Sequence, residues 1–407
     1  MTMIETIAPP VRTGSDIAVI GGGLSGTLAA CLLGRAGYSV TLIDRHRHFP
    51  PRFRAEKLGA GHIERLRRLD LLPALAGRGA AFDTVLNLRE GRLLDVTHSP
   101  HLGIRYHDLV AALRAMLPET VHVVTGQASA IRTGARRQRV AIYGQEEVTA
   151  RLLVLASGGG DLLRRNLDIV RRVVRPRHSI AFGFDLRLHD ADRFAQAAVT
   201  CYGDHLSEGI DYLTLFPVAG GLRGNLHAYC SPADCFAKTL RDRPDETLAA
   251  LFPCLAEVIG RFDVPGGIES WITDLAVAEN LRRDGIVLIG DAFQTSCPAA
   301  GTGVSRLLTD VERLCQVHLP RWMRQGTVSA ADLAGFYDDP EKRAMDAHAL
   351  DMAEFRRGLT MGTGFSSQLG RRLHFARRRA MHMVDTLSPA LAARLREISQ
   401  AHLHRSP

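Results

Sequence analysis

Three glycines near the start of the chain have a spacing that can hold a dinucleotide. Gly21, Gly23 and Gly26 form a G-x-G-x-x-G pattern directly after the apolar run 17–20, and Asp44 ends the next apolar run. In such a turn the first glycine permits a tight bend, the second lets the backbone approach a pyrophosphate, and the third lets helix and strand pack closely. Phosphate binds the free N–H groups at the helix start, and the acid accepts hydrogen bonds from ribose hydroxyls. The backbone groups expected to bind such a ligand are those of Gly21, Gly23, Leu24, Ser25 and Gly26.

A second group of glycines and acids follows another apolar strand, far along the chain. Asp291 stands at the end of that strand, where α/β sheets bind ligands. Pro298, Gly301 and Gly303 then lead into a helix expected over 304–317. The free N–H groups at the start of this helix can stabilise negative charge on a ligand. Further ligand contacts are expected from Asp291, Pro298, Gly301, Thr302, Gly303 and Val304.

Together these two segments resemble the FAD-dependent monooxygenases of the para-hydroxybenzoate hydroxylase type. That family has a GDA motif, a PxxGxG motif and an acid seven residues after the last glycine, which match Gly290, Asp291, Ala292, Pro298, Gly301, Gly303 and Asp310. The resemblance covers roughly residues 14–330. It implies noncovalent FAD, with Asp291 on a ribityl hydroxyl and the start of helix 304–317 at the pyrimidine edge of the flavin. It also implies that one oxygen atom from O₂ is inserted into an aromatic, polyketide-like or isoprenoid small molecule. The reaction would be hydroxylation or epoxidation through a flavin C4a-peroxide, chemistry that the cofactor carries.

Other positions take their expected roles from the same resemblance. Arg54 is expected to reach the FAD phosphates, because a guanidinium suits phosphate, and Arg45 lies close by. Gln127 stands where a backbone contact to adenine would fall. Gly158 takes the place of the aspartate in the family's Asp-Gly pair, and Asp161 comes three positions later. Because that pair is associated with nicotinamide binding, its loss leaves NADPH or NADH uncertain as the reductant and favours a separate flavin reductase.

The order of apolar runs predicts an α/β fold: a FAD-binding Rossmann-like βαβ domain, an inserted antiparallel β-sheet substrate domain and a C-terminal helical extension. The FAD-binding domain is expected in three parts, at 14–80, 108–175 and 276–330. The substrate domain is expected at 176–275 with a contribution from 81–107, and the helical region at 331–407. A β-meander in the second part is expected from strands at 121–124, 129–133, 140–143 and 151–156.

Candidate catalytic residues come from the inserted sheet. A strand over 224–229 would place Asn225, His227 and Tyr229 on one face by its period of two. An imidazole and a phenol can bind a substrate hydroxyl or act as a base, and Tyr212 is a third candidate. The alternative interpretation is that this polar face lies towards solvent.

The end of the chain is basic and helical. Residues 341–407 hold 12 Lys and Arg against 6 Asp and Glu, which is most of the net charge of +8. Apolar residues recur there at helical spacing, with arginines off that face. One interpretation is a helix docked on the body, and the other is a basic amphipathic helix that contacts an acidic membrane or a protein partner. The apolar positions are Leu369, Leu373, Ala376, Ala380 and Met383.

Several other classes of protein and site are disfavoured. Seven cysteines are scattered without a CxxC pair, which argues against a zinc site and a disulfide scaffold. We find no nucleic-acid-binding motif and no uninterrupted apolar run of membrane-spanning length, so a cytoplasmic protein without a metal is expected. The alternatives that stay open are a flavin-dependent halogenase, whose WxWxIP motif is absent, a geranylgeranyl-reductase-like FAD oxidoreductase, and a non-catalytic flavin-binding subunit.

Overall fold

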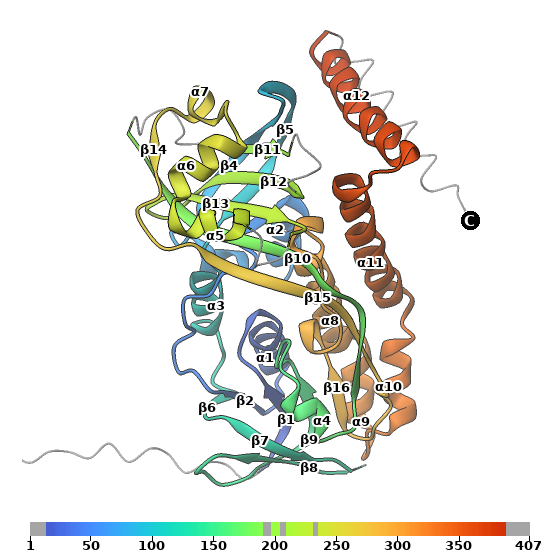
Figure 1. The fold of residues 1–407 in the computed structure, drawn as a ribbon. Coiled ribbons are helices and arrows are strands. Elements are labelled where there is room, and N and C mark those ends of the chain that lie inside the picture. Colours follow the sequence, from blue (N-terminus) through green and yellow to red (C-terminus); the bar gives the residue numbers. More distant parts are fainter. Residues whose placement is uncertain (1–13, 135, 190–196, 204–208, 231–234, 388–407) are drawn as a thin grey trace, which may run out of the picture.

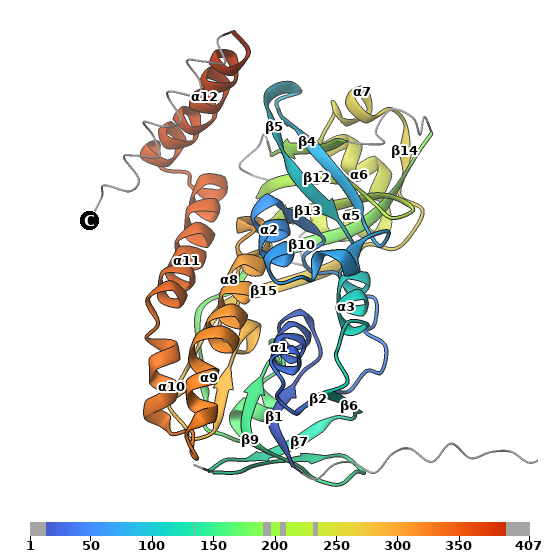
Figure 2. The ribbon, with the colours of Figure 1, turned by 180° about the vertical axis from the view of Figure 1, so that it is seen from behind.

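Two sheets form the body of the molecule. The computed structural model describes residues 14–134, 136–189, 197–203, 209–230 and 235–387. In Figure 1 one sheet lies above the other, and helices α10 to α12 run along one side. The opposite view in Figure 2 again places α1 and α8 at the level where the two sheets meet. The two glycine-containing motifs therefore lie at this junction, because each of them precedes one of these helices.

The first sheet contains the predicted βαβ unit. Its strands are β1 (Ser15–Ile20), β2 (Val40–Asp44), β6 (Val121–Thr125), β7 (Ala128–Arg132), β8 (Gln138–Ile142), β9 (Val148–Leu155) and β16 (Ile286–Leu288). Their order is β6-β2-β1-β9-β8-β7, and β16 pairs with the end of β9. Strands β7, β8 and β9 form the antiparallel meander, whereas β6 pairs in parallel with β2 at the opposite edge. The placement of 121–124 in the meander is therefore wrong, because the preceding helix α3 returns the chain in a parallel crossover.

One face of this sheet is covered by helices in an apolar cluster. The helices are α1 (Leu24–Arg35), α3 (Tyr106–Arg114), α8 (Gly303–Glu312) and α9 (Leu319–Arg324). The helix expected over 304–317 begins one residue earlier, and its α-helical part ends at Glu312. A wider π-helical turn over Arg313–His318 then joins it to α9. The other face carries the meander and the short helix α4 (Leu162–Arg165).

The second sheet is mostly antiparallel. Its strands are β3 (Lys57–Gly59), β4 (Ala80–Arg89), β5 (Arg92–Gly103), β10 (Val170–Leu188), β11 (Ala197–Tyr202), β12 (Ile210–Val218), β13 (Gly221–Ala228), β14 (Phe262–Asp263) and β15 (Glu269–Glu279). Their order is β14-β10-β13-β12-β11-β4-β5-β3, with β15 also on β10. Strand β13 ends at Ala228, one residue before the end of the expected strand 224–229.

Short helices cover the apolar face of the second sheet. They are α5 (Cys235–Asp242), α6 (Pro244–Leu251) and α7 (Leu255–Ile259), and apolar residues of the sheet and of these helices form one cluster. The opposite, polar face is left to meet the first sheet and its helices. Helix α2 (Ala60–Arg68) follows β3 and reaches α8, so the edge of the second sheet is joined to the first domain.

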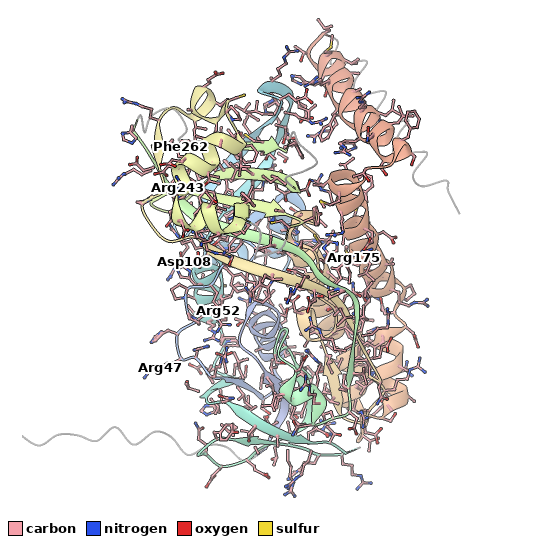
Figure 3. The ribbon with its side chains drawn as sticks, viewed as in Figure 1. Arg47, Arg52, Asp108, Arg175, Arg243 and Phe262 are labelled. Atoms are coloured by element: carbon pink, nitrogen blue, oxygen red, sulfur yellow. The ribbon has the colours of Figure 1, made fainter. Side chains whose placement is uncertain are left out.

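Helix α11 (Pro340–Met361), which follows α10 (Ala330–Tyr337), links the two halves. Near its start, the ammonium of Lys342 lies 2.6 Å from a carboxylate oxygen of Asp310 on α8. Near its end, Arg356 Nε donates to Asp211 on β12 at 3.0 Å. Arg175, labelled in Figure 3 beside this helix, pairs with Glu354 at 2.9 Å. The helical region is thus attached to both sheets by ion pairs.

Helix α12 (Phe365–Leu387) packs through the side that carries Phe375 and Arg378. Its one fully buried residue is Phe375, and Arg378 Nε donates to Asp95 on β5 at 2.7 Å. The large apolar side chains of the opposite side are between 46% and 83% exposed. We call this side the exposed stripe; its members are Phe365, Leu369, Leu373, Met383 and Leu387. The helix is docked, but its apolar face points away from the body.

Candidate cofactor and substrate site

The turn between β1 and α1 has the close backbone packing that its glycines predict. Gly21 has a φ of +104°, a conformation that favours glycine. A Cβ atom on Gly26 would collide with the carbonyl oxygen of Gly21, so this position has no room for a side chain. No side chain caps α1, which leaves N–H groups at its start, including those of Ser25 and Gly26, for a ligand.

Asp44, the expected ribose ligand, is held by its surroundings. Its carboxylate accepts hydrogen bonds from the backbone N–H of Gly22 at 2.6 Å and of His46 at 2.8 Å. Arg114, at the end of α3, lies 3.2 Å from the same carboxylate and donates to the carbonyl of Gly22 at 2.7 Å. Sequence reasoning missed Arg114, because nothing in the local pattern links the end of α3 to the glycine turn.

Tyr106 is a second residue that the sequence did not reveal. Its hydroxyl accepts a hydrogen bond from the N–H of Leu24 at 3.1 Å, at the start of α1. Burial raises the pKa of this phenol, so it stays protonated. A Cβ atom on Gly23 would lie 3.5 Å from the same hydroxyl. Tyr106 therefore lies at the place where a pyrophosphate is expected and can donate its own proton to a phosphate oxygen.

The GDA segment meets the first glycine turn. Gly290 has a φ of +61°, and a side chain on it would collide with the hydroxyl of Ser25. Its N–H donates to Asp310 at 2.9 Å. The Asp291 side chain is exposed and accepts no hydrogen bond within the described part of the chain, so it is available to a ligand.

Arg54 lies in the same region. Its guanidinium stacks on the ring of Trp271, on β15. Burial lowers its pKa to about 10, and the nearby charge of Asp291 opposes that shift. The charges of Asp291 and Arg54 also act on the pKa of Tyr106, so both side chains lie near this phenol at the start of α1. Contact between Arg54 and phosphate stays a prediction.

The PxxGxG turn forms the other end of the site. Gly301 has a φ of +68°, and α8 begins at Gly303 without a side-chain cap. The hydroxyl of Thr302 is buried and has no hydrogen-bond partner among the described residues. Val304 is buried, and Pro298 begins a short 3₁₀ turn. An uncapped helix start beside an unsatisfied hydroxyl fits a polar ring edge such as that of a flavin.

The loop after β9 contains Gly158, which stands where the family has the aspartate of its Asp-Gly pair. Gly158 has a φ of +68°, and its carbonyl accepts a hydrogen bond from the buried Arg164 at 3.0 Å. The same guanidinium donates to the carbonyls of Gly159 at 3.0 Å and Ala292 at 3.2 Å. Asp161 pairs with Arg164, so it anchors this arginine and does not replace the missing aspartate.

Two expected cofactor residues lie at the periphery. Arg45 is exposed and donates through Nε to His46 at 3.0 Å. Gln127 is also exposed, in the turn between β6 and β7. Figure 3 labels Arg47 and Arg52, in the loop after β2, on the side of the molecule away from α11. The structure brings neither Arg45 nor Gln127 into contact with the glycine turns.

The polar face of the second sheet is enclosed, so the alternative interpretation, in which this face lies towards solvent, is wrong. His227 on β13 pairs in register with Tyr212 on β12, and their ring centroids are 4.7 Å apart. Both lie close to the first domain, since the Tyr212 hydroxyl donates to the carbonyl of Ala299 in the PxxGxG turn at 3.2 Å. Asn225 shares this face and is buried. The PxxGxG turn therefore covers the Tyr212 end of this face.

Tyr229 makes no ring contact with His227, but it packs in the same apolar cluster as Tyr212, against Cys297 and Ala299. It follows the last residue of β13, and a bulge at Asp211 shifts the register beside it. Its hydroxyl lies 3.4 Å from Asp211, and its ring packs edge-on to His178. The Tyr229 hydroxyl also lies 3.9 Å from Cys297 Sγ, so Tyr229 and Tyr212 both reach the segment that leads into α8.

Burial fixes the protonation of the three candidates. It lowers the pKa of His227 to about 3, with the charges of Lys57 and Arg356 adding to the effect. It raises the pKa values of Tyr212 and Tyr229 well above that of a free phenol. The imidazole is therefore neutral and both phenols are protonated at neutral pH. His227 Nδ1 is buried and has no partner among the described residues, so it can serve a ligand.

Comparison with known proteins agrees with this geometry. A family model described as an FAD binding domain matches residues 14–317. The structure of p-nitrophenol 4-monooxygenase PnpA from Pseudomonas putida DLL-E4 is 17% identical, with a TM-score of 0.72 over 95% of this chain and 97% of that one. The flavin-dependent halogenase CmlS is 18% identical, with a TM-score of 0.72 over 96% of this chain and 78% of that one. PqsL of P. aeruginosa in complex with 2-aminobenzoylacetate is 18% identical, with a TM-score of 0.66 over 86% and 97%.

Two features are absent from the described residues. In these ranges no cluster of three or more His, Cys, Asp or Glu side chains is arranged to hold a metal ion. No helix among them has the length and apolar character needed to cross a membrane.

Proposed function

Because the chain belongs to the FAD-binding domain family, whose model matches residues 14–317, we propose that it is an FAD-dependent monooxygenase. The substrate would be an aromatic, polyketide-like or isoprenoid small molecule that receives one oxygen atom from O₂. The observation that carries the proposal is the enclosed polar face at His227 and Tyr212, which meets the PxxGxG turn through the Ala299 carbonyl. Such a face can hold a substrate beside a flavin and exclude water.

The proposal gives the residues separate tasks. Gly21, Gly23 and the start of α1 would hold the pyrophosphate with Tyr106, and Asp44 would hold the ribose. FAD, when bound, supplies the activation of O₂ that no side chain provides. Tyr212 fixes the turn before α8 through its hydrogen bond to the Ala299 carbonyl. Neutral His227 would accept a hydrogen bond from a substrate hydroxyl at Nδ1.

The names of two structural neighbours support an aromatic substrate. PnpA is named as a p-nitrophenol 4-monooxygenase, and PqsL is described in complex with 2-aminobenzoylacetate. Likeness to the flavin-dependent halogenase CmlS keeps halogenation as the second candidate. The two functions differ in the atom that the product gains.

The test uses the FAD-loaded protein after photochemical reduction. Reduced protein is mixed with ¹⁸O₂, chloride and bromide, and a panel of phenols, aromatic acids and isoprenoids, and the products are identified by mass spectrometry. Gain of one ¹⁸O atom by a panel compound supports the monooxygenase. Gain of a halogen supports the second candidate, and gain of two hydrogen atoms without oxygen supports a reductase.

A separate flavin reductase is the second part of the proposal. The carbonyl groups of Gly158 and Gly159 are engaged by Arg164, and the aspartate that the family associates with nicotinamide binding is missing from this loop. Both facts favour reduction of the flavin by a partner protein over reduction by NADPH or NADH bound at this loop.

The third part concerns the exposed stripe of α12. Arg372 and Arg379 lie on one flank of the stripe and Arg377 on the other by helical spacing. A row of apolar side chains flanked by arginines suits an anionic membrane surface, which binds apolar and basic groups together. We propose that α12 lies on such a surface through its exposed stripe, while the rest of the molecule stays on the aqueous side.

A further inference from the structure

Lys57 is a half-buried cation that forms no ion pair with a carboxylate of the described residues, although its ammonium lies 5.9 Å from the centre of the Phe216 ring. Its ammonium donates to the hydroxyl of Thr214 at 3.1 Å, and burial lowers its pKa to about 8. No carboxylate among the described residues contributes to that pKa. By contrast, Lys342 lies 2.6 Å from a carboxylate oxygen of Asp310, and Arg223 donates to Glu56 at 2.7 Å.

The position of Lys57 places its charge inside the proposed substrate site. Lys57 belongs to β3, at one edge of the second sheet, yet its side chain reaches Thr214 on β12, with three strands between them in the sheet order. The sheet must therefore curl, so that Lys57 crosses its polar face. Thr214 stands two residues from Tyr212 on the same strand and thus on the same face. Helix α2, just after β3, brings His62 within 2.8 Å of Ser305 in the first turn of α8.

The imidazoles and hydroxyls around Lys57 are neutral, and the buried carboxylate of the adjacent Glu56 is already paired with Arg223 and accepts a hydrogen bond from Asn225. His227 and His101 both feel its positive charge, and burial lowers the pKa of each imidazole. Thr200 donates to the Thr214 hydroxyl at 3.4 Å and supplies no charge. Among the described residues Thr214 accepts one hydrogen bond from the ammonium, which leaves two of its three N–H groups for a ligand.

An enclosed charge without a counter-charge is unfavourable unless a ligand supplies one. We infer that Lys57 is the anion-binding group of the substrate site, and that the substrate is an aromatic acid or acidic phenol whose oxyanion pairs with its ammonium. His227 Nδ1, which has no partner in the described residues, would then bind a second polar group of the same molecule. The inference rests on the proposed function for the position of the substrate, and it adds the chemical class.

The pairing predicts a linked proton. Below about pH 8 Lys57 is mostly protonated, so an anion binds with little proton uptake. Above that pH the free protein has lost the proton, and binding must restore it, because the bound anion raises the pKa of the ammonium. Affinity for an anion should therefore fall as pH rises through 8, with proton uptake approaching one per ligand. His101 and His227 stay neutral across this range because their pKa values are lowered.

The test is calorimetry on the oxidised, FAD-loaded protein, without turnover. The probes are benzoate and 4-nitrophenolate, with benzamide and nitrobenzene as neutral counterparts, and each titration is repeated in two buffers of different ionisation enthalpy. Wild type should bind at least one anionic probe more tightly than its neutral counterpart. Lys57→Met should weaken that binding about 10- to 100-fold, the effect of one charged hydrogen bond. Lys238→Met, which removes an exposed lysine, is the matched control and should change nothing.

Thermal unfolding separates a binding role from a structural role. If the ammonium has no counter-charge in the ligand-free protein, Lys57→Met should melt at a higher temperature than wild type without ligand, because the substitution removes an unpaired and partly buried charge. Equal affinity for the charged and neutral probes would overturn the inference, as would failure of both anions to bind. A lower melting temperature for Lys57→Met would instead make Lys57 structural, and loss of FAD would assign it to the cofactor. Neither result depends on whether the reduced protein oxygenates a substrate, so failure of the proposed function is seen separately.

Discussion

Gly303 offers a test of where the flavin lies that does not depend on the substrate. Apart from chain and helix neighbours, a Cβ atom there would meet only the Cβ of Ser296, at an ordinary distance of 3.6 Å. Valine also has a slightly better helix propensity than glycine. Gly303→Val should therefore leave the stability of the cofactor-free protein within about 0.5 kcal/mol of wild type.

The expected loss appears only with the cofactor. If the N–H groups of Gly303 and Val304 face the flavin, the new side chain removes one of these hydrogen bonds. A neutral hydrogen bond contributes about 0.5–1.5 kcal/mol and a charged one about 1.5–3 kcal/mol. Reduced flavin carries negative charge, so it should lose about 1 kcal/mol more than oxidised flavin. Because about 1.4 kcal/mol corresponds to 30 mV for a two-electron couple, the reduction potential should fall by about 20 mV.

The assay compares three proteins. Affinity for FAD is measured by quenching of flavin fluorescence, the potential by equilibration with a reference dye, and stability by thermal unfolding without FAD. Gly358→Val, at an exposed position of α11 with open space around it, is the control for a helical glycine outside the site. If Gly303→Val binds FAD with wild-type affinity and potential, the PxxGxG segment is only a turn and the flavin does not lie against it.

Five further predictions concern other parts of the molecule. Denaturation should release FAD rather than FMN. Arg114→Met should weaken FAD binding about 10-fold, because the carboxylate of Asp44 loses one charged hydrogen bond; unchanged affinity would mean that the Arg114–Asp44 pair does not help to bind the ribose. Lys342→Met should destabilise the protein by about 3 kcal/mol, because the buried carboxylates of Asp310 and Asp346 must then share the guanidinium of Arg306. Adding Asp310→Asn should recover part of that loss in urea unfolding. Anaerobic stopped-flow should show slow or no bleaching of the flavin by NADPH or NADH alone. Rapid bleaching would show that the protein needs no separate reductase. Flotation with phosphatidylserine vesicles should recover wild type but not the double variant Leu369→Glu and Leu373→Glu, while phosphatidylcholine vesicles should recover neither; equal recovery of both proteins would mean that the stripe does not contact lipid.

The sequence predicted the parts of the fold that short spacing encodes. The G-x-G-x-x-G turn, its flanking strands and the acid after β2 lie within one βαβ unit, so local pattern and final structure coincide. Tyr106 and Arg114 could not be found in this way. Tyr106 meets Leu24 from 82 positions along the chain, and only the packing of α3 on the first sheet brings them together.

For the inserted sheet, too, the sequence predicted local features but not the contacts between distant segments. Alternation correctly placed Asn225 and His227 on one face, but it could not tell whether solvent or another domain covers that face. The enclosed position depends on β3 and α2, which come from the part of the chain assigned to the FAD-binding domain. Tyr229 lies one residue beyond the end of β13, because a bulge at Asp211 interrupts the regular pairing with β12 there, and the type of residue at 229 does not encode that strand end.

The arginines illustrate why composition gave no functional signal. The sequence has 51 Lys and Arg, of which only three are lysines, and a count cannot distinguish a solvated guanidinium from a structural one. Arg114 and Arg164 each bind backbone carbonyl groups from segments distant in the sequence, at Gly22 for the first and at Ala292 for the second. Each uses several N–H groups of one planar fork, which a lysine cannot reproduce. Arginine thereby holds the loops of the cofactor site together, whereas Lys57 is the enclosed cation whose charge no carboxylate of the described residues matches. That difference is what identifies Lys57 as a binding group.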